Sequence, residues 1–326
     1  MIQRILVPLD GSTLAECVLP HVAAIASAHE AETIFLNVVH SESGTPDPIN
    51  VDLRLRRAEA ACYLEEKAAA LQARNLPVDV VVLEGRPAEQ IRDFARRESI
   101  DLIVVSDKGE GGSALRLGAV AQKVVSGGDT SILLVRAASG LALEFDDPYR
   151  RIMVPVDGSP LADWALCLAG SIARELQADL LIVFAVEIPD MPRRLPPAEH
   201  EAEARRRLVR ANRRAARRYL DDMKRKLEGE RLRVRTRLVV TDNVPKILHK
   251  VAEEEDVDLI VASAHGASGD SEWEYGSVAT NLITYGRKPL LVFQDASQVR
   301  ARVPSEVPSC AELHGPVQLM HNGAGG

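Results

Sequence analysis

Two aspartates stand where a carboxylate could bind a ligand. Asp10 lies in the run V-P-L-D-G-S and Asp157 in V-P-V-D-G-S, each directly after a short apolar stretch. A carboxylate in this position can accept hydrogen bonds from a ribose hydroxyl or an exocyclic amine. The same Asp-Gly-Ser residues also suit a turn that caps the next helix. Taken alone, the motif favours the turn and cap.

A second group of residues has the chemistry of an anion site. The run from Ser263 to Gly266 reads S-A-H-G, and after nine further residues Gly276, Ser277 and Val278 open a helical pattern. Glycine leaves the backbone unobstructed, and amides with a serine hydroxyl at a helix N-terminus suit phosphate oxygens. The spacing matches neither a Walker loop nor G-x-G-x-x-G. An ordinary strand-to-helix connection remains the alternative.

Both motifs belong to a repeat. The run R-I-L-V-P that starts at Arg4 returns as R-I-M-V-P at Arg151, and D-L-I-V at Asp101 returns at Asp258. A shared offset over such distances indicates two copies of one domain. We expect a first unit over residues 1–137, a linker over 138–149, a second unit over 150–294 and a disordered tail over 295–326.

Apolar runs alternate with helical patterns in each copy. Because the apolar runs are too continuous for a half-exposed sheet, they predict parallel strands that are covered on both faces. Each unit is therefore predicted to be α/β, a doubly wound five-stranded parallel sheet. The expected strands are 5–8, 33–39, 78–83, 102–106, 132–135, 152–155, 180–186, 234–240, 259–263 and 290–293. The expected helices are 14–29, 51–74, 88–97, 119–126, 162–176, 199–227, 246–255 and 278–285.

The phosphate loop is less complete in the first copy. It runs S-D-K-G from Ser106 to Gly109, then eight residues, then Gly118 and Ala119. One residue and the serine hydroxyl are missing, although Lys108 could still meet a phosphate. The second copy keeps the spacing but places three acids in its loop, which would repel a triphosphate unless a metal bridges them. Those acids are Asp270, Glu272 and Glu274.

The two V-P-x-D-G-S runs, the D-L-I-V strands and the loop pattern together resemble the universal stress protein family, over about residues 1–137 and 150–294. Ser263 replaces the first glycine of that family's loop G-x-x-G-x9-G-(S/T). The resemblance implies a nucleotide-binding α/β unit of the adenine-nucleotide-alpha-hydrolase type, which holds ATP in some members and not in others. It also implies pairing through the last strand, here an intramolecular pseudo-dimer of the two units, with further homodimerisation left open.

The resemblance places the main nucleotide site in the second unit. Asp157 would contact the adenosine, the backbone near the end of the first strand and at Ala185 would flank the base, and the glycine loop would surround the phosphates. The implied second-unit residues are Pro155, Val156, Asp157, Ala185, Ser263, His265, Gly266, Gly276, Ser277 and Val278. A weaker first-unit site would use Leu9, Asp10, Val38, Lys108, Gly109 and Gly118. The ligand would be ATP or AMP, with or without Mg²⁺.

Charge is distributed unevenly along the chain, whose net charge is −7. Residues 193–237 hold seventeen Lys and Arg against seven acids. Such a segment invites a nucleic-acid partner. The lack of interleaved aromatic residues argues against one, and we expect the segment to dock on the acidic body of the protein. No apolar run is long enough to span a membrane, so we expect a cytoplasmic protein that does not bind membranes.

Catalysis has little support in the sequence. His265 stands beside Ser263, but no third orienting group is evident, and neither histidines nor cysteines show metal-ligand spacing. We therefore expect no catalytic residue, no metal site and at most slow ATP hydrolysis. Two function classes remain. One is a stress-response regulator that binds an adenine nucleotide and signals to an unknown protein partner; the other is an interaction or scaffold protein that has kept the fold and lost the ligand.

Overall fold

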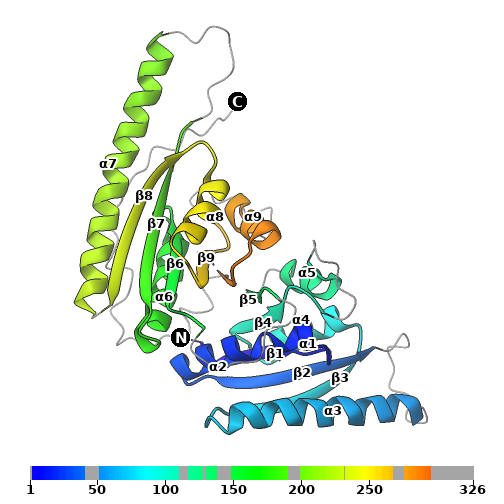
Figure 1. The fold of residues 1–326 in the computed structure, drawn as a ribbon. Helices are drawn as coiled ribbons and strands as arrows, with labels where there is room; N and C mark the ends of the chain where they lie inside the picture. The colour runs from blue at the N-terminus through cyan, green and yellow to red at the C-terminus, as the bar shows by residue number, and fades with distance from the viewer. Residues whose placement is uncertain are drawn as a thin grey trace.

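Ten strands alternate with helices in the computed structural model (Figure 1). It describes residues 2–40, 51–109, 117–127, 130–137, 148–189, 199–230, 232–266 and 275–294. The predicted tail, most of the predicted linker and the three loop acids Asp270, Glu272 and Glu274 lie outside these residues. Within the described part, no helix is both long and apolar enough to cross a bilayer.

The elements follow the predicted order in both units. The first unit contains β1 (Arg4–Pro8), α1 (Thr13–Glu16), α2 (Leu19–His29), β2 (Glu32–His40), α3 (Val51–Gln72), β3 (Val78–Gly85), α4 (Pro87–Arg97), β4 (Leu102–Ser106), α5 (Ala119–Val125) and β5 (Ser131–Val135). The second contains β6 (Arg151–Val156), α6 (Pro160–Glu175), β7 (Asp179–Glu187), α7 (Glu199–Gly229), β8 (Arg233–Thr241), α8 (Val244–Glu254), β9 (Leu259–Ser263), α9 (Ser277–Tyr285) and β10 (Leu290–Phe293).

All ten strands join one sheet in the order β3-β2-β1-β4-β5-β10-β9-β6-β7-β8. Neighbours within each unit are parallel, so the predicted α/β class is confirmed. The last strands of the two units are antiparallel neighbours, with Leu291 opposite Leu133. In the first unit, β2 and β3 lie on one side of β1, and β4 and β5 lie on the other. The carboxyl ends of β1 and β4, and of β6 and β9, are therefore the switch points where open sheets bind ligands.

Helices cover both faces of this sheet. Side chains from α2, α3, α6 and α7 pack in one apolar cluster with alternate strand residues such as Ile5 and Val7. Side chains from α4, α5, α8 and α9 pack in a second cluster with the intervening residues, such as Leu6. Because the central strands β1, β4, β5, β6, β9 and β10 are buried on both sides, their sequences are mostly apolar rather than alternating. The edge strand β8 is half-buried and begins with arginine at alternate positions.

The single helix predicted over residues 14–29 is wrong. The structure has a short α1 ending at Glu16 and a separate α2 starting at Leu19, with Pro20 in the first turn of α2. A proline inside a helix removes a backbone donor and clashes with the carbonyl four residues earlier, here that of Glu16. At the start of a helix neither cost applies, so the chain breaks the helix immediately before Pro20.

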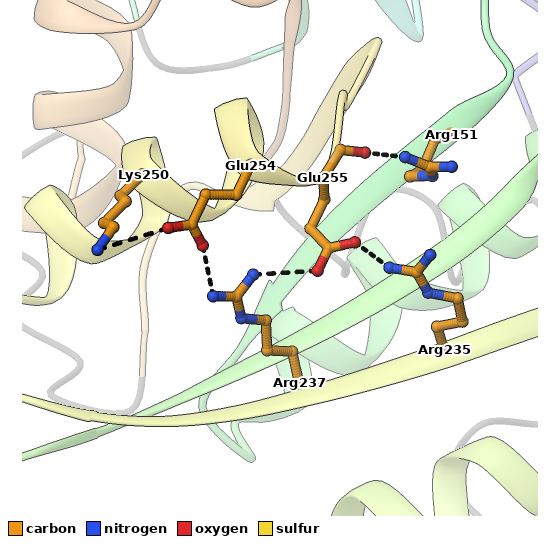
Figure 2. A network of polar contacts seen from close by, with 6 residues as sticks. All are labelled: Arg151, Arg235, Arg237, Lys250, Glu254 and Glu255. Atoms are coloured by element: carbon orange, nitrogen blue, oxygen red, sulfur yellow. Dashed lines mark hydrogen bonds and ion pairs between the residues drawn. The ribbon is translucent and has the colours of Figure 1, made fainter.

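An ion-pair network braces the open edge strand β8 (Figure 2). Glu255 accepts from Arg235 and, at 3.0 Å, from Arg237, whose other amino group is 2.6 Å from Glu254. The hydrogen bond from Arg237 holds the pKa of Glu254 below its ordinary value. The backbone carbonyl of Glu255 also accepts from Arg151 at the start of β6. The network therefore lies toward the amino ends of the strands, away from the switch points.

Most arginines of α7 face solvent, whereas Arg205 is half-buried. The helix packs on β7 and β8 through a buried stripe that includes Ala216, Tyr219, Leu220 and Met223. The opposite face is exposed along residues 206–218. The segment 193–237 therefore contacts the body in two ways: α7 packs through its apolar stripe, whereas Arg233, Arg235 and Arg237 of β8 pair with the acids Asp179, Glu254 and Glu255.

Candidate nucleotide site

The motif V-P-V-D-G-S forms a turn and a helix cap. The backbone amide of Ser159 donates to Asp157 Oδ1 at 2.9 Å, and Gly158 takes φ 82°, where a side chain would be strained. Ser159 Oγ then accepts from the amide of Ala162 at 3.2 Å and caps α6. The first unit repeats the geometry with Asp10 and Ser12. The turn-and-cap interpretation is thus correct. The turn bond is made to the Oδ1 atom of each aspartate.

The second carboxylate oxygen lies against the glycine of the phosphate loop. A Cβ added to Gly266 would come within 2.4 Å of Asp157 Oδ2, and one added to Gly109 would come within 2.4 Å of Asp10 Oδ2. These residues meet because β6 pairs with β9 and β1 with β4. Both units therefore bring the aspartate and the glycine together at the switch point, and only glycine fits there without moving the carboxylate.

The helix after the loop has an uncapped N-terminus. The amide of Gly276 donates to the carbonyl of Ala264 at 2.8 Å, which holds the start of α9 beside Gly266. Gly276 is the N-cap residue, and α9 has no side-chain capping bond, in contrast to α6. Among the described residues no side chain caps this turn, so its amides, starting at the exposed Ser277, can face an anion.

The other predicted residues of the second unit lie around the site formed by Asp157, Gly266 and Gly276. Val156 ends β6 opposite Phe184, and Ala185 is the next residue of β7 and is half-buried. Pro155, Ser263, His265 and Val278 are also half-buried, at the ends of β6 and β9, in the loop and in the first turn of α9. The structure thus brings Asp157, Gly266 and Gly276 into direct proximity, whereas Ala185 lies two strands away from β9.

The first-unit loop is held by its own side chains. Ser106 Oγ donates to the carbonyl of Lys108 at 2.5 Å and accepts from its amide at 3.1 Å. Asp107 accepts from the amide of Ala137 at 2.8 Å and faces Arg136 at 3.8 Å. Gly118 donates to the carbonyl of Asp107 at 2.8 Å, as Gly276 does to Ala264. The backbone frame is thus repeated, but Ala119 follows Gly118 where the second unit has Ser277.

The remaining first-unit residues also lie around the carboxyl end of β1. Leu9 follows β1 directly, and its carbonyl accepts from Asn37 Nδ2 at 2.7 Å. Val38 is the next residue of β2 and is half-buried, and Lys108 is half-buried in the loop. The Leu9 carbonyl is therefore already hydrogen-bonded by Asn37, which is a further chemical difference between the first-unit site and the second-unit site.

A buried acid–tyrosine pair behind each site escaped the sequence analysis. Asp163, 2% exposed, accepts from the hydroxyl of Tyr219 on α7. Glu16 accepts from Tyr63 on α3 at 3.2 Å and also pairs with Lys67 at 3.2 Å. Burial, with the charges of Asp163 and Asp157, raises the pKa of Tyr219. The sequence does show an acid six residues after each motif aspartate, namely Glu16 and Asp163. The tyrosine that binds each acid comes from a helix distant in the sequence, so the pair could not be predicted.

We expect Tyr219→Phe to destabilise the protein by about 1–3 kcal/mol, because the buried Asp163 loses its hydroxyl donor. Urea unfolding at neutral pH measures this change. Tyr63→Phe is the matched control and should cost less, since Glu16 keeps its ion pair with Lys67. A larger loss from Tyr63→Phe than from Tyr219→Phe would contradict the assignment.

Comparisons with known proteins match both units of the chain to one family. The "Universal stress protein family" model matches residues 1–136 and 148–294. A universal stress protein of Thermus aquaticus is 37% identical over 142 residues, which are 42% of this chain and all of that protein. One of Methanocaldococcus jannaschii, MJ0531, is 28% identical over 41% of this chain and 82% of its own length. The solved universal stress protein of Archaeoglobus fulgidus has the same fold at TM-score 0.62 and 18% identity, covering 89% of this chain and 98% of its own. With the family matched over both copies of the repeat, the chain belongs to the universal stress protein family.

Proposed function

We propose that this chain is a stress-response regulator that binds an adenine nucleotide, ATP or AMP, mainly in its second unit. The bound nucleotide, with or without Mg²⁺, orders the glycine loop and changes the surface shown to a protein partner. A ligand changes the populations of two conformations only if it binds one of them more tightly than the other. The proposal places the protein in the cytoplasm.

One observation carries the proposal: Asp157, Gly266 and the uncapped start of α9 converge at the switch point between β6 and β9. Asp157 would accept hydrogen bonds from the nucleoside. The amides of α9 and of the loop backbone at Gly266 would donate hydrogen bonds to the phosphate oxygens, since a helix N-terminus favours negative charge. These groups bind a ligand rather than attack it, so we propose no catalytic role for Ser263 or His265, and at most slow hydrolysis of bound ATP.

The first unit is the weaker candidate. Its aspartate and glycine repeat the second-unit geometry, but Ala119 lacks a hydroxyl and Asp107 is bound to Ala137 and Arg136. An anion would meet the Asp107 carboxylate next to the loop, which disfavours a phosphate at that place. We therefore propose one occupied site per chain.

The pairing of β5 with β10 supports an intramolecular pseudo-dimer. Several hydrogen bonds join the units beside it, among them those from Tyr275 to the Val125 carbonyl at 2.8 Å and from Arg136 to the Leu282 carbonyl at 3.0 Å. His21 also lies 2.8 Å from the hydroxyl of Tyr149, the last residue of the predicted linker. Tyr275 directly precedes the phosphate-binding Gly276. The second site is therefore anchored on the first unit, and we propose that the two units act as one body.

Gly266→Ala tests the site without unfolding the protein. The new Cβ would come within 2.4 Å of Asp157 Oδ2, which lies at the far end of a flexible side chain, so the carboxylate must shift while the backbone can stay in place. We expect nucleotide affinity to fall at least about tenfold, equivalent to about 1.4 kcal/mol, with an unchanged unfolding midpoint. Calorimetric titration with Mg-ATP and with AMP, after mass spectrometry of the small molecules released from purified protein, gives the affinity.

Gly109→Ala is the matched control, because its Cβ meets Asp10 as that of Gly266→Ala meets Asp157. It should change affinity less than twofold. The reverse result would move the site to the first unit. If the wild-type protein is empty and binds neither nucleotide, the interaction or scaffold function of the same fold replaces this proposal.

A further inference from the structure

The exposed face of α7 is a continuous strip of positive charge. Between residues 204 and 220 there are eight arginines and no acidic residue. Seven of the arginines are exposed and, at about 100° per residue, fall within about 140° of the helix circumference. These seven, which we call the arginine stripe, are Arg206, Arg207, Arg210, Arg213, Arg214, Arg217 and Arg218.

Few of these charges are neutralised within the protein. Arg207 pairs with Glu203 at 2.6 Å, and Arg206 donates to the carbonyl of Ala202. The other five have no ion pair with any residue for which the structure gives side-chain contacts. Like charges one turn apart on a helix destabilise it, so folding does not require this composition.

The internal repeat supplies a direct comparison. The equivalent helix in the first unit, α3, covers β2 and β3 as α7 covers β7 and β8. Yet α3 contains four acidic and four basic residues and no net charge. The same fold position is therefore filled by a neutral helix in one copy and by an arginine-rich helix in the other. The difference points to a binding role that the second unit alone has.

We infer that the arginine stripe binds the phosphate backbone of a nucleic-acid duplex. The stripe extends over twelve residue steps from Arg206 to Arg218, about 18 Å of helix. One strand of a duplex presents a phosphate about every 3.4 Å along its axis, so the stripe faces about five phosphates. Arginine binds phosphate oxygens through two parallel hydrogen bonds, which lysine does not.

The composition of the stripe also indicates how it binds. The exposed arc between its arginines carries no aromatic side chain that could stack on an unpaired base and no large apolar anchor of the kind that dominates protein interfaces. The side chains of Tyr219 and Leu220 are buried against the sheet. Backbone contact without base stacking is independent of sequence and favours a duplex over a single strand. The helix α7 lies on the outer side of the second unit, over β7 and the edge strand β8 (Figure 1).

Binding is measured by fluorescence anisotropy with a labelled duplex of about 20 base pairs and mixed sequence, between about 50 and 300 mM KCl. We expect micromolar or tighter binding at the lowest salt and a slope of log affinity against log salt near −4, since each neutralised phosphate contributes about −0.9. Replacing the five unpaired arginines (Arg210, Arg213, Arg214, Arg217 and Arg218) by glutamine should reduce affinity at least about 100-fold and flatten the slope. Glutamine is a good helix former, and the exposed positions leave the fold intact.

Two control variants separate the stripe from general charge. Arg54→Gln with Arg56→Gln and Arg57→Gln removes three exposed arginines from α3 and should leave affinity within about threefold. Lysine at the five stripe positions should restore the salt slope but only part of the affinity lost with glutamine, because lysine cannot make the paired hydrogen bonds of arginine. No binding by the wild-type chain at low salt, or an equal loss from the α3 variant, would overturn the inference. So would displacement of the duplex by polyglutamate or by phosphatidylserine vesicles at equal charge concentration, which would assign the stripe to an acidic protein or a membrane.

Discussion

Arg136→Met should destabilise the protein by about 3–5 kcal/mol, the usual cost of removing one partner of a buried ion pair. Arg136 directly follows β5, and its side chain is 14% exposed, as is that of Asp107, which it faces at 3.8 Å. Its other amino group donates to the carbonyls of Leu282 and Ile283 at 3.0 and 2.9 Å. Methionine keeps the length of the side chain but removes every one of these donors.

The loss should be concentrated in the second unit. Leu282 and Ile283 lie in the last turn of α9, where most carbonyls have no partner within the helix, although that of Leu282 also accepts from the amide of Gly286 at 2.9 Å. A residue of the first unit therefore binds the C-terminal end of α9, the helix that follows the second unit's phosphate loop. Urea unfolding measures the global effect, and hydrogen exchange over residues 277–285 should show lost protection of α9 in the variant.

Arg86→Met is the matched control. Arg86 pairs with Glu89 at 3.2 Å on the surface, where the two side chains are 71% and 63% exposed. Exposed pairs contribute less than about 1 kcal/mol, so this variant should be nearly as stable as the wild type. If Arg136→Met costs no more than Arg86→Met, the cross-unit cap does not stabilise the fold.

Acidification from pH 8 to pH 5 should remove about 4 kcal/mol of stability, about 2 kcal/mol from each of two histidines of α2. Burial lowers the pKa of both His21 and His29 to about 4. His21 Nδ1 lies 2.8 Å from the hydroxyl of Tyr149, which is itself buried just before the second unit. His29 is 8% exposed.

The sign follows from proton uptake. The unfolded chain protonates these histidines near pH 6.5, whereas the folded chain keeps them neutral until about pH 4. Between these values the unfolded state binds more protons, so falling pH favours unfolding. The contribution is fully present above pH 6.5 and is lost progressively down to about pH 4. Urea unfolding at pH 8, 7, 6 and 5 gives the curve.

Replacing each histidine by a residue that does not titrate isolates its share. His21→Gln keeps a polar group beside Tyr149, and His29→Leu fills a buried position with an apolar side chain. Each single variant should remove about half of the pH dependence, and the double variant most of it. A wild-type stability that stays flat between pH 8 and 5 would show that these histidines are charged in the folded state.

Much of the architecture was predictable from the chain because it depends on local patterns. Continuous apolar runs fix buried parallel strands, and the repeated V-P-x-D-G-S fixes two equivalent switch points. The broken helix before Pro20 could have been read from the proline itself, since the rule that forbids it in a helix interior is local. The fold and the family therefore required no tertiary information.

The site was predictable only in part. Glycine next to a strand end signals a close backbone approach, and the structure places Gly266 against Asp157. Tyr219 behind the site and Arg136 at the end of α9 gave no such signal. Their hydrogen bonds join residues 56 and 146 positions apart. Contacts at that range depend on how helices pack on the sheet, which no local pattern specifies.

By itself, the sequence determined the duplication, the α/β class and the aspartate and glycine positions of both units. Only the tertiary structure decided which face of α7 is buried and that Arg136, Tyr149 and Tyr275 connect the units. The physical reason is the difference between local and long-range interactions. Periodicity and turn chemistry act over a few residues, whereas burial, ion pairing and helix capping across the β5–β10 junction exist only once distant segments are packed together.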